Sequence, residues 1–448
     1  MNNPVWIDDK GKIVEPEYCL DFLSRHPMRC INDHFYTVDG PLPDESKLKR
    51  TIYEEISPWL HDKVAQTVEQ VLKTLKLAAY ADPLPLQCDR IHVANGTCFL
   101  DGTFTEKKEY CSNRLSVSYR ADAPAPEHWL CFLSELLEPE DIPALQEYLG
   151  YCLIPSTKGQ KMLMLIGKGG EGKSRIGVMM NAIFGLNMNT TSIQKVENSR
   201  FARADLEGKL LMLDDDLDMN ALTKTNYVKS IVTAQGKMDL ERKGKQSYQG
   251  WMFARLLAFS NGDLQALYDR SDGFYRRQLV LTTKERPVNR ADDPDLAEKM
   301  KAEAEGIFLW ALEGLRRLVA SNFKFTESDR IRENREAVKR DNNNIFDFME
   351  SEGYIRRKAD ASISSKDFYE IYRMWCEENS LAPLKARSFS DAMIANAGRF
   401  NLEHCNNITN SAGRRVWGFM GVEAVARPHI NGFYDVSPCT YVPEGWRE

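Results

Sequence analysis

The stretch 161–185 constrains the fold more than any other part of the sequence. An apolar run, KMLMLIG, leads directly into GKGGEGKS, which fits the pattern G-x-x-x-x-G-K-[S/T] and is followed by the helical segment SRIGVMMNAIFG. In such a loop the glycines let successive backbone N–H groups curl around an oxyanion at the start of a helix. The sequence therefore predicts a strand, a phosphate-binding loop and a helix in that order. Residues 167–174 are called the glycine-rich loop below.

Most residues of the glycine-rich loop have an expected role. Lys173 is expected to reach the β- and γ-phosphates of a nucleotide, and the Ser174 hydroxyl to be a ligand of Mg²⁺. The other candidate nucleotide-binding residues are Gly167, Gly169, Gly170, Glu171, Gly172 and Arg175. A glycine-rich turn with a surface lysine is the alternative, but the strand before it and the helix after it argue against this. The expected cofactors are therefore ATP and Mg²⁺.

A second apolar strand, predicted over 209–213, runs into three consecutive aspartates, Asp214, Asp215 and Asp216. Nucleotide hydrolysis needs one acid at the end of a neighbouring strand to hold Mg²⁺ and a second carboxylate to orient the attacking water. Asp214 and Asp215 fit these two roles, as metal-binding and catalytic residues. The triple run leaves this assignment open by one residue, and a solvated acidic turn is the alternative.

A third strand, predicted over 255–259, ends in Ser260 and Asn261. An amide at this place can hydrogen-bond the γ-phosphate or the attacking water, so Asn261 is predicted to sense hydrolysis. Taken alone, a polar turn residue is the simpler interpretation. The position of Asn261 after the first two motifs favours the sensor.

Composition limits the classes of protein that remain. The chain has 448 residues, of which 43% are hydrophobic and 28% are charged, which is ordinary globular composition and predicts roughly two to four domains. No apolar run is long enough to span a bilayer, and the start lacks the apolar segment of a secretion signal, so we expect a soluble, cytoplasmic protein with no membrane partner.

Metal chemistry and charge add two further limits. The 10 cysteines and 7 histidines are scattered without metal-ligand spacing, so we expect reduced thiols and neither a zinc site nor a metal-dependent strand-nicking site. The net charge of −6 argues against nonspecific coating of nucleic acid. It leaves room for a local basic channel.

Changes in periodicity divide the rest of the chain. Helical spacing marks a helix over 64–75, an Asn95-Gly96 turn with positive φ angles predicts a hairpin, and two short helices precede the glycine-rich loop. Alternating strands and helices in the central block predict a parallel sheet. We predict a mostly helical region over 1–85, a hairpin with helices over 86–155, an ATPase core over 156–290, a helical lid or linker over 291–344, a small domain over 345–421 and a tail over 422–448.

The order of these motifs resembles the superfamily 3 helicases, specifically the phage and plasmid primase-helicases related to the poxvirus one. The motifs are GKGGEGKS, LLMLDDD, VKSIVTAQGKMDLERKGK and LLAFSN, and the similarity extends over residues 89–420. It implies an α/β fold: a P-loop AAA+ type parallel sheet with flanking helices, a helical N-terminal region and a C-terminal winged helix. It also implies a homo-oligomeric ring, a hexamer, that moves along single-stranded DNA.

The resemblance assigns further residues to DNA and to a neighbouring subunit. Lys229 lies in the family's extra motif, and Lys243 and Lys245 lie at the tip of a pore hairpin that grips phosphates. A charged, exposed hairpin is the alternative. Arg276 or Arg277 is placed as a catalytic arginine finger that enters the neighbouring site. The alternative for this pair is ion pairing at a strand edge, and the sequence does not choose between the two arginines.

The C-terminal segment has a predicted core and a predicted DNA surface. In the helix 366–378 one apolar face is expected to be core rather than a base-stacking surface; it consists of Phe368, Ile371, Tyr372 and Trp375. In a winged helix, Arg387, Arg414 and Arg415 are placed to meet a DNA groove and backbone. Winged helices also dock proteins, and this alternative stays open.

The expected function is that of an ATP-dependent DNA helicase that replicates a phage, plasmid or other mobile element. The region before residue 86 is too short for a primase domain, so a separate primase or polymerase is an expected partner, beside single-stranded DNA and origin duplex DNA. Two other classes remain open: an origin-binding initiator whose nucleotide site drives assembly, and a P-loop ATPase switch that does not act on DNA.

Overall fold

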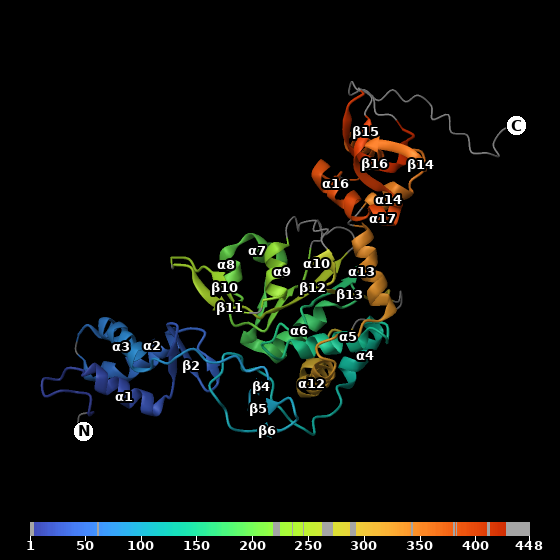
Figure 1. The fold of residues 1–448 in the computed structure, drawn as a ribbon. Coiled ribbons are helices and arrows are strands. Elements are labelled where there is room, and N and C mark those ends of the chain that lie inside the picture. Colours follow the sequence, from blue (N-terminus) through green and yellow to red (C-terminus); the bar gives the residue numbers. More distant parts are fainter. Residues whose placement is uncertain are drawn as a thin grey trace. The chain divides into compact units, whose positions relative to one another are not determined.

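The computed structural model describes residues 4–60, 62–217, 225–234, 236–244, 246–261, 272–286, 293–341, 344–379, 381, 383–409 and 413–426. The chain divides into two compact units, residues 1–338 and 339–448 (Figure 1). In the described part of the chain, no helix is both long enough and apolar enough to cross a membrane.

The N-terminal part of the first unit combines three helices with a small antiparallel sheet. These elements are α1 (Glu15–Arg25), β1 (Arg29–Ile31), β2 (His34–Thr37), β3 (Gly40–Pro41), α2 (Ser46–Ile56), a 3-10 turn (Ser57–Trp59) and α3 (Val64–Ala78). The periodic face of α3 is buried, including Val71 and Leu75, which are 0% exposed. Helical spacing therefore located α3, whereas the mostly helical prediction for 1–85 left out the sheet.

The predicted hairpin is present, but its turn differs from the expected one. Its strands are β4 (Arg90–Val93) and β5 (Gly96–Phe99), followed by β6 (Phe104–Thr105). Neither Asn95 nor Gly96 has a positive φ. The Asn95 amide instead bonds the Tyr119 backbone through its nitrogen and its oxygen, both at 2.8 Å. A Cβ at Gly96 would lie 2.1 Å from the Thr105 carbonyl oxygen, so close packing requires this glycine.

A five-stranded parallel sheet forms the centre of the first unit, as the sequence predicts. Its order is β13-β7-β12-β9-β8, and a separate antiparallel hairpin pairs β10 with β11. The strands are β7 (Met162–Gly167), β8 (Met188–Thr190), β9 (Leu211–Asp214), β10 (Lys237–Leu240), β11 (Tyr248–Trp251), β12 (Arg255–Asn261) and β13 (Gln278–Thr282).

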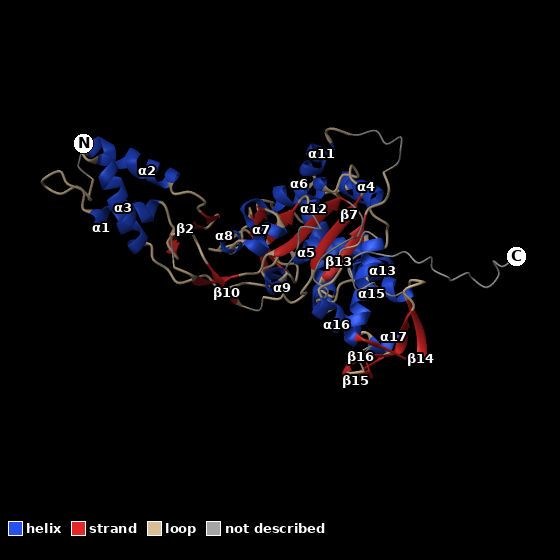
Figure 2. Ribbon diagram, turned by 90° about the horizontal axis from the view of Figure 1, so that it is seen from above, coloured by secondary structure: helices blue, strands red, loops and turns tan. Residues whose placement is uncertain are grey.

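Helices cover both faces of this sheet (Figures 1 and 2). One face packs on α4 (Glu127–Leu136), α5 (Ile142–Tyr151), α6 (Ser174–Phe184), α11 (Leu296–Ala302) and α12 (Ala304–Ala320). The other packs on α7 (Ile193–Asn198), α8 (Arg200–Ala204), α9 (Asn226–Val232) and α10 (Asp272–Tyr275). Successive residues of β7 enter opposite cores, Leu163 one and Met164 the other. A strand buried on both faces explains why KMLMLIG is continuously apolar.

In its described residues, the second unit has three antiparallel strands in the order β14-β16-β15 and four helices. After α13 (Asp329–Asp341), the elements are α14 (Ile345–Glu350), β14 (Ile355–Ser364), α15 (Ser365–Glu378), α16 (Ala386–Ala395), α17 (Ala397–Phe400), β15 (Glu403–Thr409) and β16 (Arg415–Ala424). The apolar face predicted as core in α15 is buried. Most of the predicted tail, residues 427–448, lies outside the described residues.

Candidate active site

The glycine-rich loop joins the carboxyl end of β7 to the first residue of α6, Ser174. Its backbone adopts φ angles of +103° at Gly169, +82° at Gly170 and +108° at Gly172, which side chains disfavour. A Cβ at Gly167 would lie 2.8 Å from the Lys173 ammonium nitrogen. The loop therefore depends on glycine both for its backbone path and for the close approach of Lys173.

Glu171 and Lys173 form a buried ion pair inside this loop. Their side chains are 5% and 6% exposed, and Glu171 Oε2 lies 2.8 Å from Lys173 Nζ. Glu171 Oε1 accepts a hydrogen bond from the Gly169 N–H, also at 2.8 Å. Burial alone would raise the pKa of Glu171, but the hydrogen bonds from Lys173 and the backbone outweigh it and lower the pKa. The loop thus binds a carboxylate of its own, which shows that its donors suit an oxyanion.

A cavity of about 550 Å³ opens beside the loop. It brings together predicted residues from three places in the sequence, and it is lined by Gly170, Glu171, Gly172, Lys173, Ser174, Arg175, Asp215, Asn261, Arg286, Asp293, Pro294 and Leu296. These residues meet because β12 lies between β7 and β9, so the carboxyl ends of the three parallel strands are neighbours. The size is that of a small-molecule site.

The three consecutive aspartates point in different directions. Asp214 is 4% exposed and does not line the cavity; its carboxylate accepts hydrogen bonds from the backbone N–H groups of Ile193 (2.7 Å) and Asp216 (3.4 Å). Burial raises the pKa of Asp214. Asp216 Oδ1 lies 3.5 Å from Asn261 Nδ2. Asp214 thus accepts a hydrogen bond at the start of α7, and Asp215 is the aspartate of the three that lines the cavity; the metal-binding roles of Asp214 and Asp215 stay predictions.

Arg286 is a cavity residue that sequence reasoning missed. The chain continues past β13 along the loop, with the Thr283 N–H donating to the Ile166 carbonyl at 2.9 Å. This path carries Arg286 Nη1 to 3.4 Å from the Gly170 carbonyl oxygen. The sequence signal that could have predicted this position is a basic residue shortly after β13, the strand next to β7. No motif singles it out.

Arg276 and Arg277 lie at the other end of the sheet. The Arg277 carbonyl accepts from the Met162 N–H at the amino end of β7, whereas the glycine-rich loop follows the carboxyl end. The Arg277 guanidinium donates to the Gly273 carbonyl, and Arg276 is exposed. Neither arginine lines the cavity of its own chain. Their predicted role in a neighbouring subunit stays a prediction.

The predicted DNA contacts are spread over both units. Lys229 is half-buried on α9, and Lys243 is exposed in the β10–β11 turn, whereas Lys245 lies outside the described residues. In the second unit, Arg387 is exposed at the start of α16, and Arg414 and Arg415 are exposed where β16 begins. Lys243 and the three arginines are therefore accessible to solvent. Contact of the predicted residues with DNA stays a prediction.

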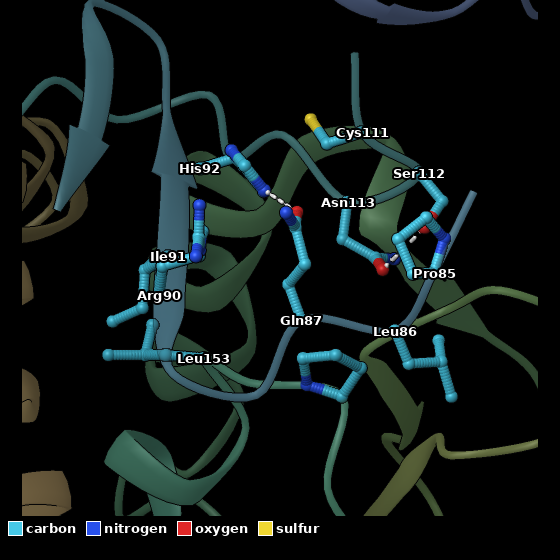
Figure 3. Close-up of a pocket in the computed structure, with 11 residues that line it drawn as sticks. Pro85, Leu86, Gln87, Arg90, Ile91, His92, Cys111, Ser112, Asn113 and Leu153 are labelled. Atoms are coloured by element: carbon cyan, nitrogen blue, oxygen red, sulfur yellow. Dashed lines mark hydrogen bonds between the residues drawn. The ribbon is translucent and has the colours of Figure 1, made fainter. Parts of the chain in front are cut away.

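A second cavity, near β4, is too small to be a substrate site. It measures about 20 Å³ and lies beside His92 (Figure 3). His92 Nε2 lies 2.7 Å from Gln87 Oε1 and its Nδ1 lies 3.2 Å from Thr97 Oγ1. Burial, and then the nearby charge of Arg114, lowers the pKa of His92 to about 4. Across the described ranges, no group of three or more His, Cys, Asp and Glu side chains is arranged to hold a metal.

Two stretches of the chain match known protein families. Residues 165–277, which include the glycine-rich loop, Asp215 and Asn261, match a family of unknown function. Residues 340–410 match the Poxvirus D5 protein-like family. The second unit therefore carries a D5-like segment. We find no match among curated proteins.

Among the solved structures with a similar fold are three of the NrS-1 C-terminal region. These three apo structures have 12, 10 and 11% identity and TM-scores of 0.48, 0.49 and 0.49. The alignments cover 72, 87 and 92% of this chain and 75, 88 and 100% of the other.

Proposed function

We propose that this chain is an ATP-dependent helicase that translocates on single-stranded DNA in a replication system of phage or viral type. The observation that carries the proposal is the shared cavity of about 550 Å³, lined by Lys173 and Ser174 of the loop and by Asp215 and Asn261 of neighbouring strand ends. The D5-like segment at 340–410 supports a role in replication. Assembly into a ring of copies, a hexamer, is part of the proposal.

The residues of the cavity fit ATP and Mg²⁺. The loop already holds a carboxylate between the Gly169 N–H and Lys173, and phosphate oxygens suit the same donors. The Ser174 hydroxyl offers an oxygen ligand, the type that Mg²⁺ prefers. When bound, Mg²⁺ neutralises charge on the transferring phosphoryl group. Asp215 then accepts a proton from the attacking water, and Asn261 orients that water.

Strand order supports the finer fold assignment of each unit. If β7, β8, β9, β12 and β13 are numbered one to five in chain order, the strands stand side by side in the sheet in the order 5-1-4-3-2, as expected for a P-loop AAA+ core. In the second unit, α14, β14, α15, α16, α17, β15 and β16 follow each other, with β16 between the other two strands. This succession supports a winged helix, whose wing would lie between β15 and β16.

The test is ATP hydrolysis with and without single-stranded DNA. Wild type should hydrolyse ATP, the rate should rise when single-stranded DNA is added, and strand displacement should accompany it. Lys173→Ala should remove all three activities. Lys168→Ala is a matched control, because Lys168 belongs to the same loop but is 79% exposed and bonded to Glu285.

Three other outcomes contradict the proposal. Absence of hydrolysis in wild type would exclude the ATPase. A rate of ATP hydrolysis that does not change when single-stranded DNA is added would indicate a P-loop switch. Nucleotide-dependent binding to origin duplex without strand displacement would indicate an initiator.

A further inference from the structure

Trp251 lies between two cavities at the base of the β10–β11 hairpin. One cavity measures about 570 Å³ and the other about 530 Å³, and Trp251 and Phe253 line both. Trp251 is 38% exposed, which is unusual for the largest apolar side chain. An indole that lines two cavities and is partly exposed can receive a flat ring on an open face.

The outer face of the hairpin places a cation beside this indole. Trp251 pairs with Lys237 across the two strands, and the Lys237 ammonium lies 5.7 Å from the centre of the indole ring. The alternate residues of the hairpin, Leu240 and Gly250, are buried against the core. Trp251 and Lys237 therefore share the exposed face of the hairpin that ends in Lys243.

The walls of both cavities combine cations with amides. The larger cavity has Lys158, Gln160 and Asn322, and the smaller one has Lys237 and Gln249. Among the described residues neither Lys158 nor Lys237 forms an ion pair with a carboxylate; Lys158 lies over the Phe323 ring instead.

One carboxylate lines the smaller cavity, and it is neutralised locally. Glu207 accepts hydrogen bonds from Arg242 at 2.9 Å and from the Tyr248 hydroxyl at 2.6 Å. No other acidic residue lines either cavity in the described part of the chain. The two ammonium groups are thus available to an anionic ligand.

We propose that Trp251 is a base-stacking residue for single-stranded nucleic acid. One base lies against the face of the indole opposite Lys237, and Lys158 and Lys237 contact the phosphates of the same strand. Aromatic platforms flanked by cations are how proteins bind single strands without sequence preference, and the amides suit base edges. The inference rests on the proposed function only in taking DNA as the strand; the site itself follows from these two cavities.

The experiment compares the full chain with Trp251→Ala and Trp251→Phe in binding to two fluorescent strands of equal length, oligo(dT) and its abasic counterpart, without nucleotide. Stacking is worth about 1–3 kcal/mol per base. Trp251→Ala should therefore weaken binding to oligo(dT) on the order of 10-fold or more, and it should leave binding to the abasic strand unchanged. Trp251→Phe should retain most of the affinity for oligo(dT). Tyr53→Ala, which removes an aromatic ring that is 50% exposed on α2, is the matched control and should bind both strands like wild type.

Two results would overturn the inference. In the first, Trp251→Ala binds oligo(dT) as tightly as wild type. In the second, Trp251→Phe, with its ring retained, loses affinity for the oligo(dT) and abasic strands alike. A Trp251→Ala protein that binds DNA normally but changes its native mass would place a protein interface here instead. If wild type binds neither strand, the proposed function fails; if wild type binds and hydrolyses ATP but Trp251 is irrelevant, only this inference fails.

Discussion

Lys173 Nζ lies 2.8 Å from Glu171 Oε2, and both side chains are buried within the glycine-rich loop. The group predicted to bind phosphate is therefore already paired with a carboxylate. A nucleotide that uses Lys173 must either displace Glu171 or share the ammonium with it, close to a second anion. Because buried charges interact strongly, this pair opposes nucleotide binding.

Glu171→Gln should therefore raise nucleotide affinity. The amide keeps the size of the side chain but removes the competing negative charge, so we expect roughly 10-fold tighter binding of ADP, or about 1.4 kcal/mol. Isothermal titration calorimetry measures this directly. Glu285→Gln is the control, because the Glu285–Lys168 pair flanks the same loop but is about 80% exposed and should change affinity little. Unchanged or weaker ADP binding in Glu171→Gln would show that the pair does not compete with phosphate.

Substitutions of Asp214 and Asp215 should have different effects, one on stability and the other on catalysis. Asp214→Ala removes the acceptor for the Ile193 N–H, and the loss of a buried hydrogen bond should lower the free energy of unfolding by about 1–3 kcal/mol. Asp215→Ala removes an exposed carboxylate at the cavity and should leave stability unchanged, while ATP hydrolysis falls on the order of 100-fold or more. Thermal unfolding and steady-state hydrolysis of both variants test this. If Asp214→Ala instead lost hydrolysis without losing stability, Asp214 would be the catalytic or metal-binding aspartate.

The sequence was sufficient for the framework of this site because its signals are local. Continuous apolar runs and the spacing of GKGGEGKS predict buried parallel strands and a loop at their carboxyl ends. The choice between Asp214 and Asp215 depends instead on a hydrogen bond to Ile193, which comes from another element. Arg286 is likewise brought in by the path of the chain after β13.

Exposure explains the elements that the sequence did not reveal. Strand β14 has the burial pattern of an edge strand, with a run of exposed residues from Arg356 to Asp360, so no alternation of apolar and polar residues marks it. The Asn95-Gly96 pair gave a wrong prediction of positive φ angles because of tertiary packing. Both residues are used for tertiary packing, Asn95 against Tyr119 and Gly96 against Thr105, and local turn statistics do not include such contacts.

Gly150→Ala and Gly314→Ala should both destabilise the first unit. The two glycines lie where α5 crosses α12: a Cβ at Gly150 would lie 2.3 Å from the Ala311 carbonyl oxygen, and one at Gly314 would lie 2.4 Å from that of Gln146. Backbone atoms cannot rotate away, so we expect each variant to lose about 1–3 kcal/mol. Gly398→Ala is the control, because open space surrounds that glycine. Calorimetry measures the unfolding temperature of the three variants. Equal unfolding temperatures would contradict the close contact between α5 and α12.

His92 should make stability depend on pH. Its pKa falls from the usual 6.5 to about 4 in the folded chain because of burial. Between these values the unfolded chain binds a proton that the folded chain does not, so the free energy of unfolding should fall as pH decreases from 6.5 to 4. The loss reaches up to about 3 kcal/mol. Denaturant unfolding across this range measures it, with His92→Gln as the comparison. An identical decline in His92→Gln would assign the pH dependence to other groups.

Arg276 should act on the active site of a neighbouring copy. It is exposed at the amino end of the sheet, whereas its own cavity lies at the carboxyl end, and Arg277 is already bonded to Gly273. Arg276→Ala should therefore bind ATP but hydrolyse it roughly 1,000-fold more slowly. Lys173→Ala should also be inactive, yet it still carries Arg276. A mixture of the two inactive proteins should recover activity, because mixed assemblies contain sites with an intact loop from one chain and an intact arginine from the other. A mixture that assembles and binds ATP but stays inactive would exclude Arg276 as the residue supplied by the neighbour.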